Sequence, residues 1–186
     1  MRTTSILVML LAATWASLGA PPTPRPAPEL AWTVPGQGQQ TLKQYLGKVV
    51  ALEFIYTTCK HCFGPAQVLD KLQQELGGQG FQAIEVAFDP NASVLAEAFI
   101  ADQHLKLPVG WTLGDQVSSF LGYGPTDRFV VPQIVLVDRA GVVRYQTRVQ
   151  GHDDLRSEPV LRARITELLQ PANAAPKPPE TAKPRR

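Results

Sequence analysis

Two long apolar runs dominate the pattern of hydrophobic and polar positions along the chain. Residues 49–55 are apolar apart from Glu53, and residues 81–88 form a second, largely apolar run. Runs of this kind are typical of strands that are covered on both faces in a parallel sheet. We therefore predict two buried strands in the first half of the chain.

Apolar residues at helical spacing follow each of these runs. After the first run they are Cys62, Ala66, Leu69, Leu72 and Leu76, and Gly77-Gly78 supplies a stop. After the second run they are Leu95, Phe99 and Ile100, following an Asp89-Pro90-Asn91 turn and a cap at Asn91 or Ser93. Strands joined by helices pair in parallel with right-handed crossovers, so a parallel sheet core is expected.

A hairpin and a last helix complete the pattern. Residues 132–137 and 142–148 flank the turn 138–141, in which Gly141 supplies a positive φ, so these two runs predict an antiparallel hairpin. Ser157 is the expected cap of the last helix, with Pro159 in its first turn. The residues that this helix would bury are Leu161, Ile165, Leu168 and Leu169.

The two ends of the chain differ in composition from the middle. Residues 1–20 combine the basic Arg2 with an apolar stretch of about 13 residues, which predicts a signal peptide, or an N-terminal anchor if it stays uncleaved. Residues 21–29 and 171–186 are rich in proline and alanine, the latter also in lysine, and both are expected to be disordered. Residues 30–170 then form one domain of an exported, periplasmic or extracytoplasmic protein. The net charge of +2 does not point to nucleic acid, and a membrane contact is expected only with an uncleaved anchor.

The only two cysteines, Cys59 and Cys62, enclose two residues directly after the first apolar run. A disulfide between them closes so short a loop that it would stabilise the fold by only roughly 2 kcal/mol, so redox chemistry explains the pair better than stability. Zinc would need two further ligands, and covalent haem would need a histidine where Phe63 stands. We predict a redox-active disulfide and no other cofactor. Lys60 and His61 between the cysteines place positive charge near the sulfurs and favour a thiolate.

The order of these elements resembles the thioredoxin fold, and it is most similar to the TlpA/ResA branch of exported redoxins, which is related to AhpC/TSA proteins. The resemblance covers roughly residues 39–169. It rests on three landmarks in order, namely residues 54–62 with the C-x-x-C pair, residues 86–90, and Val130-Val131-Pro132 with residues 137–141. It implies an α/β fold with a central mixed sheet flanked by helices.

The resemblance also implies roles for individual residues. Cys59 would be the attacking thiol and Cys62 the resolving one, while Glu53, six residues before Cys59, would be a buried acid that relays protons to Cys62. Desolvation should raise the pKa of Glu53. Pro132 would be the family's cis proline, and the backbone of Val131 would bind an extended substrate.

Two departures from the family pattern are visible. Thr58 replaces the aromatic residue common before the first cysteine, and Gly64-Pro65 falls where the helix should already run. The expected function is thiol-disulfide exchange with protein thiols or disulfides and a redox partner protein, in either direction. The alternative is a Sco-like copper-binding chaperone for cytochrome oxidase assembly, using both cysteines and His104 or His152, although Sco cysteines normally enclose three residues. A peroxiredoxin would carry threonine where Tyr56 stands.

Overall fold

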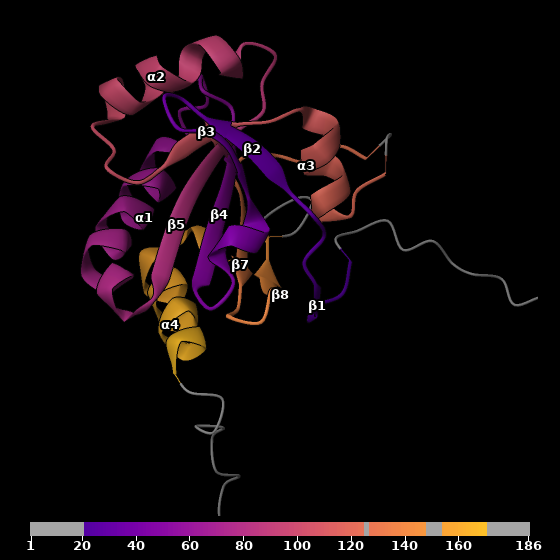
Figure 1. The fold of residues 1–186 in the computed structure, drawn as a ribbon, viewed down its shortest axis with the longest axis vertical. Helices are drawn as coiled ribbons and strands as arrows, with labels where there is room; N and C mark the ends of the chain where they lie inside the picture. Colours follow the sequence, from indigo (N-terminus) through magenta and orange to yellow (C-terminus); the bar gives the residue numbers. More distant parts are fainter. Residues whose placement is uncertain (1–20, 125–126, 148–153, 171–186) are drawn as a thin grey trace, which may run out of the picture.

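A computed structural model describes residues 21–124, 127–147 and 154–170, which form one mixed sheet with helices on both faces (Figure 1). The strands are β1 Arg25–Pro26, β2 Ala31–Val34, β3 Gly38–Thr41, β4 Val49–Ile55, β5 Phe81–Ala87, β6 Val109–Trp111, β7 Gln133–Val137 and β8 Val142–Gln146. The α-helices are α1 Phe63–Leu76, α2 Ala92–Gln103, α3 Gly114–Leu121 and α4 Glu158–Leu169. Short 3₁₀ helices are η1 Leu42–Tyr45, η2 Gly77–Gln79 and η3 Asp154–Arg156.

The strand order within the described residues is β1-β8-β7-β4-β5-β6-β2-β3. β5 pairs in parallel with both β4 and β6, whereas β7 pairs antiparallel with β4 and with β8. The buried parallel strands, the hairpin and the mixed sheet predicted from the sequence are thereby confirmed.

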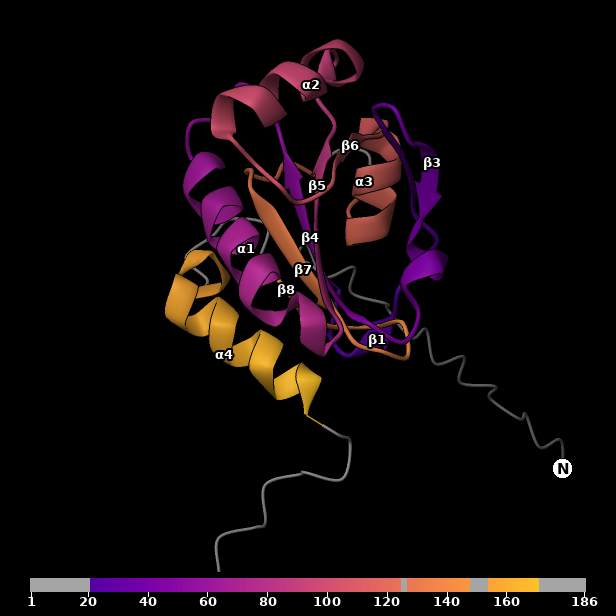
Figure 2. The same ribbon diagram turned by 60° about the vertical axis from the view of Figure 1, so that its left-hand side comes forward.

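The two faces of β4 belong to two separate cores, which explains why the whole strand is apolar. Val49, Ala51 and Ile55 pack in the core beneath α1 and α4, and the alternating residues pack in the core that contains Phe120 of α3. Figure 2 shows α1 and α4 on one side of the sheet and α3 on the other. All seven residues of β4 are buried, as expected for a strand covered on both faces.

The prediction of a disordered linker at residues 21–29 is wrong. Arg25 and Pro26 form β1, which pairs with the edge of β8, and the Ala27 N–H donates to the Gly141 carbonyl at 2.9 Å. The Arg25 guanidinium donates to the Phe120 carbonyl at 2.9 Å. The partners of this segment lie more than 90 residues away along the chain, and proline is tolerated on such an edge strand. Composition alone therefore gave no sign of its order.

The predicted signal peptide or anchor at 1–20, and the predicted disordered tail at 171–186, lie outside the described residues. Within the described parts of the chain, no helix is long and apolar enough to cross a membrane.

Candidate active site

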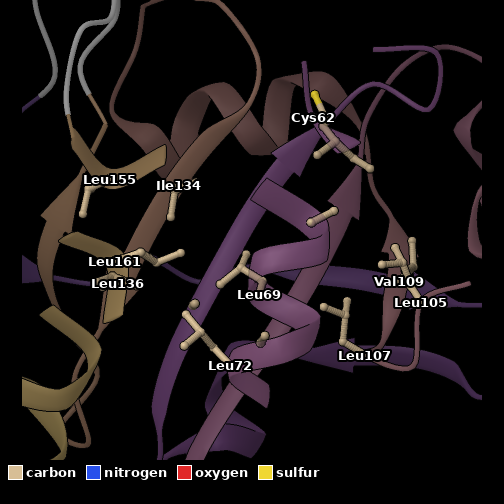
Figure 3. Close-up of a cluster of buried hydrophobic side chains, with 14 of the residues drawn as sticks. Cys62, Leu69, Leu72, Leu105, Leu107, Val109, Ile134, Leu136, Leu155 and Leu161 are labelled. Carbon is tan, nitrogen blue, oxygen red and sulfur yellow. The ribbon is translucent and has the colours of Figure 1, made fainter. Parts of the chain in front are cut away.

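The two cysteines occupy the connection between β4 and α1, at the carboxyl end of the central strands. The Cys59 N–H donates to the Tyr56 carbonyl at 2.9 Å, and the Cys62 N–H donates to the Cys59 carbonyl at 3.1 Å. Two successive turns therefore lead into the helix, whose N-cap residue is Cys62 (Figure 3). Pro65 lies in the first turn of the helix, where a missing N–H leaves no hydrogen bond unmade.

The two thiols have different surroundings. Both cysteines are free, Cys59 is partly exposed, and Cys62 is fully buried at the top of the core beneath α1. Burial raises the pKa of the Cys62 thiol strongly, and the Cys59 sulfur and the charge of Glu53 raise it further. Cys59 is therefore accessible from solvent. Cys62 is shielded from solvent, and a base must remove its proton before it can act as a nucleophile.

Glu53 is fully buried, which confirms the burial that its apolar neighbours predicted. It lies two residues from both Ala51 and Ile55 along the strand, so it points to the same face of the sheet as they do, beneath α1, on which Cys62 also lies. Desolvation raises the pKa of Glu53 to about 8, the charge of Cys59 also raises it, and the neighbouring Glu85 carboxyl group and the positive charge of Arg156 lower it. A carboxyl group with a pKa in this range can accept a proton near neutral pH. Its part in proton transfer stays a prediction.

Glu85 is a second fully buried carboxyl group, which the sequence analysis did not single out. It is the direct partner of Glu53 in the parallel β4–β5 pair. Desolvation raises its pKa well above the ordinary value, and the charges of Glu53 and Asp70 add to this rise. Glu85 lies inside a run that predicted only a strand, and no spacing rule links it to the cysteines.

Asp89 fixes the point where β4 ends and the cysteine loop begins. Its Oδ1 accepts a hydrogen bond from the Thr57 N–H at 2.7 Å, and its Oδ2 accepts one from the Thr57 hydroxyl at 3.1 Å. The sequence analysis treated Asp89 only as part of a strand-ending turn. Because β4 and β5 are parallel neighbours, their carboxyl ends meet at one edge, which is why the residue after β5 can reach the loop after β4.

Val131 and Pro132 lie immediately before β7, and the peptide bond between them is cis, as the family resemblance implied. β7 runs antiparallel to β4 with Gln133 opposite Phe54, so Pro132 lies at the same end of the strands as the cysteine loop. Pro132 is buried, and Val131 is partly exposed.

Arg156 of η3 forms hydrogen bonds to the backbone of Pro132. Its Nε and Nη2 donate to the Pro132 carbonyl at 3.1 and 2.8 Å. The Gln133 side chain donates to the Val130 carbonyl at 2.6 Å and thereby holds the residues before the proline. Neither residue carried a signal in the sequence, because both act through contacts between distant segments.

Lys60 and His61 are exposed in the turn between the two cysteines. His104 is exposed at the C-cap of α2, and His152 lies outside the described residues. Within the described ranges, no group of three or more His, Cys, Asp and Glu side chains is arranged to hold a metal ion.

An aromatic surface adjoins the cysteine loop even though Thr58 has replaced the usual aromatic residue. The Tyr56 ring, 41% exposed, contacts Phe88 at 4.7 Å between centroids, and Phe88 stacks on Phe129 at 5.9 Å. These rings line a groove of about 510 Å³ together with Trp111. Aromatic side chains thus line a groove that includes Tyr56, three residues before Cys59, at other positions than the family pattern suggests.

The sheet order, the cysteine turn at the start of α1 and the cis proline beside it define a thioredoxin-like protein. Residues 24–146 match the model of the AhpC/TSA family, so the chain belongs to that family, as the sequence resemblance indicated. No curated protein matches the chain.

Solved structures support the same fold. The chain is similar to a putative thiol:disulfide interchange protein DsbE from Chlorobium tepidum, with a TM-score of 0.66 and 24% identity over 79% of this chain and 97% of that one. It is also similar to a putative protein disulfide isomerase from Bacteroides thetaiotaomicron, with a TM-score of 0.63 and 25% identity over 84% and 96% of the two chains. The predicted thioredoxin-like fold is confirmed, and nothing in these likenesses favours the copper-binding alternative.

Proposed function

We propose that this protein is an exported thiol-disulfide oxidoreductase that exchanges a Cys59–Cys62 disulfide with protein partners through a mixed disulfide. The observation that carries the proposal is the unequal burial of the two thiols. Cys59 is accessible at the start of α1, while Cys62 lies in the core on the face of Glu53. An accessible nucleophile and a shielded resolving thiol are the two parts that the reaction needs.

In the reducing direction, the Cys59 thiolate attacks one sulfur of a partner disulfide. The partner's S–S bond breaks, and its second cysteine leaves as a thiolate that takes a proton from water. Cys62 then gives its proton to the Glu53 carboxylate and attacks the Cys59 sulfur, which releases the partner's first cysteine. Two electrons pass to the partner, and the reverse sequence oxidises a partner dithiol.

Lys60 and His61 tune this reaction through their charge. Positive charge beside Cys59 stabilises the thiolate of the reduced form, which makes the disulfide more oxidising. Because 30 mV corresponds to about 1.4 kcal/mol for a two-electron couple, the two residues supply on the order of tens of millivolts.

The partner docks at the end of the sheet where the cysteine loop and Pro132 lie. The backbone of Val131 offers hydrogen bonds to an extended segment, and the groove beside Tyr56 receives its apolar side chains. Support comes from the exposure of Val130 and Tyr56, 51% and 41%, at this end. Export rests on the apolar segment within residues 1–20.

Trapping of the mixed disulfide tests the proposal. Cys62→Ser leaves the attacking thiol without its resolving partner, so incubation with an unfolded disulfide-bonded protein should accumulate a covalent complex that a reductant dissolves. Cys59→Ser is the matched control and should form none. Equal trapping by both variants, or by neither, would contradict the assignment of Cys59 as the nucleophile.

A further inference from the structure

The Glu53–Glu85 pair is the most unusual polar feature of the core. The two residues are in register on the parallel strands β4 and β5, and both side chains are 0% exposed. Paired residues of neighbouring strands point to the same face at a spacing of about 4.8 Å, so the two carboxyl groups lie side by side beneath α1.

The carboxyl oxygens of Glu53 and Glu85 have no hydrogen-bond donor among the described residues. Neither a backbone nor a side-chain N–H, nor any hydroxyl, of the described residues donates to any of the four carboxyl oxygens. The nearest polar group that the register gives each carboxyl group is therefore the other one. A hydrogen bond between them requires a proton on one of the two, because two carboxylates are both acceptors.

The surrounding charges also favour a shared proton. The charge of Cys59 raises the pKa of Glu53 and the charge of Arg156 lowers it, whereas the charge of Asp70 on α1 raises the pKa of Glu85. The Asp70 carboxylate accepts hydrogen bonds from the Lys106 and Leu107 N–H groups, so its negative charge is held in place. Arg156 is the positive group among these, and it acts on Glu53. Proton retention is therefore favoured at Glu85 and ionisation at Glu53.

We propose that Glu85 is a positioning residue for the exchange reaction, whose carboxyl group stays protonated and donates a hydrogen bond to the Glu53 carboxylate. This inference rests on the proposed function for its role, since the base that it assists is the acceptor of the Cys62 proton. In the fraction of molecules that can resolve the mixed disulfide, the pair holds one proton, on Glu85. When Cys62 releases its proton to Glu53 the pair holds two, and the Cys62 thiolate attacks the mixed disulfide. Glu53 later returns that proton to solvent or to a departing thiolate.

Without the donor, Glu53 would lie ionised in an apolar site with less stabilisation and would hold its proton to higher pH. The hydrogen bond from Glu85 keeps a useful fraction of Glu53 deprotonated near neutral pH. An amide at position 85 can still donate through its NH₂ group, whereas an alkyl group cannot. Glu85→Gln and Glu85→Leu therefore separate the donor role from mere space filling.

The test is a ¹³C NMR titration of glutamate side-chain carboxyl groups in the full chain with reduced cysteines, assigned with Glu53→Gln and Glu85→Gln. We expect the Glu85 resonance to remain that of a neutral acid throughout the titration of Glu53. The Glu53 midpoint should stay within about half a pH unit in Glu85→Gln and rise by about one unit or more in Glu85→Leu. Glu97→Gln, on the exposed face of α2, is the control and should move neither resonance.

The rate of Cys62 resolution gives the functional readout. Its pH profile should follow the Glu53 midpoint, so Glu85→Leu should be about threefold to tenfold slower at pH 7, with Glu85→Gln close to the parent. Downward movement of the Glu53 midpoint in both variants would mean that Glu85 is ionised, and no movement in either would mean that the groups are independent. Both results overturn the inference. If Glu85→Leu fails to fold, ionisation of Glu85 before Glu53 in the parent still overturns it. A normal titration without thiol exchange would instead refute the proposed function alone.

Discussion

The buried Glu53 should make the stability of the protein fall as the pH rises, and Glu53→Gln should make that fall shallower by the part that Glu53 contributes. The pKa of Glu53 is raised from 4.5 to about 8, first by desolvation. The folded protein therefore keeps a proton that the unfolded chain has lost at any pH between these two values. Because the folded state binds more protons, the free energy of unfolding decreases with pH across this window and levels off above pH 8.

The size of the effect follows from the same two values. At about 1.4 kcal/mol per pH unit, a rise from 4.5 to about 8 corresponds to about 5 kcal/mol. Typical domains have 5–15 kcal/mol in all, so the effect is large. Glu53→Gln should match the parent near pH 4.5, where the acid is neutral, and exceed it in stability by several kcal/mol at pH 8.

Urea denaturation of the reduced protein at pH 4.5, 5.5, 6.5 and 8 measures both curves. Glu97→Gln, which removes an exposed carboxyl group, should parallel the parent at every pH. Parallel curves for the parent and Glu53→Gln would refute the argument, because they would mean that Glu53 ionises equally easily in the folded and unfolded chain.

Three further predictions concern the active site. Glu53→Gln should slow resolution of the mixed disulfide while leaving alkylation of Cys59 by iodoacetamide nearly unchanged, and equal loss of both rates would contradict a role confined to resolution. Asp89→Ala removes both hydrogen bonds at the start of the cysteine loop and should cost about 1–3 kcal/mol in thermal or urea unfolding, whereas Asp89→Asn, which keeps one acceptor, should cost less. Replacement of Lys60-His61 by Gly-Pro should lower the reduction potential by tens of millivolts in glutathione equilibration, and an unchanged potential would dismiss the electrostatic argument.

The long elements could be predicted because their signal is local. Residues 49–55 are apolar on both faces, and this alone specified a doubly covered strand that the structure places at the centre of the sheet. The shortest strands could not be predicted in this way. β6 has three residues and β1 two, and β1 exists only because the edge of β8 offers it partners.

The same contrast between local and long-range signals applies to the residues of the candidate site. Cys59 and Cys62 were predicted as site residues because their spacing after a strand is readable, and Glu53 and Pro132 because a family resemblance supplied their roles. Glu85, Asp89 and Arg156 were missed because each acts across the sheet or between distant segments, through a register or a contact that the sequence does not spell out.

The Glu53–Glu85 pair is the part of the core that fold stability does not explain. A buried pair of carboxyl groups without donors destabilises a fold, and apolar residues in the same place would usually be neutral or better. Its presence beneath α1 therefore supports the proposed role of the pair in proton transfer.

Equilibration of the purified protein with glutathione buffers, followed by mass spectrometry of the alkylated cysteines, tests the central claim most directly. A redox-active pair predicts one reversible two-electron transition between about −270 and −120 mV, and its position within that range tells a reductant from an oxidant. A potential below about −300 mV would mark a structural disulfide, and the absence of any Cys59–Cys62 disulfide would mark an inert pair. Either result would contradict the account.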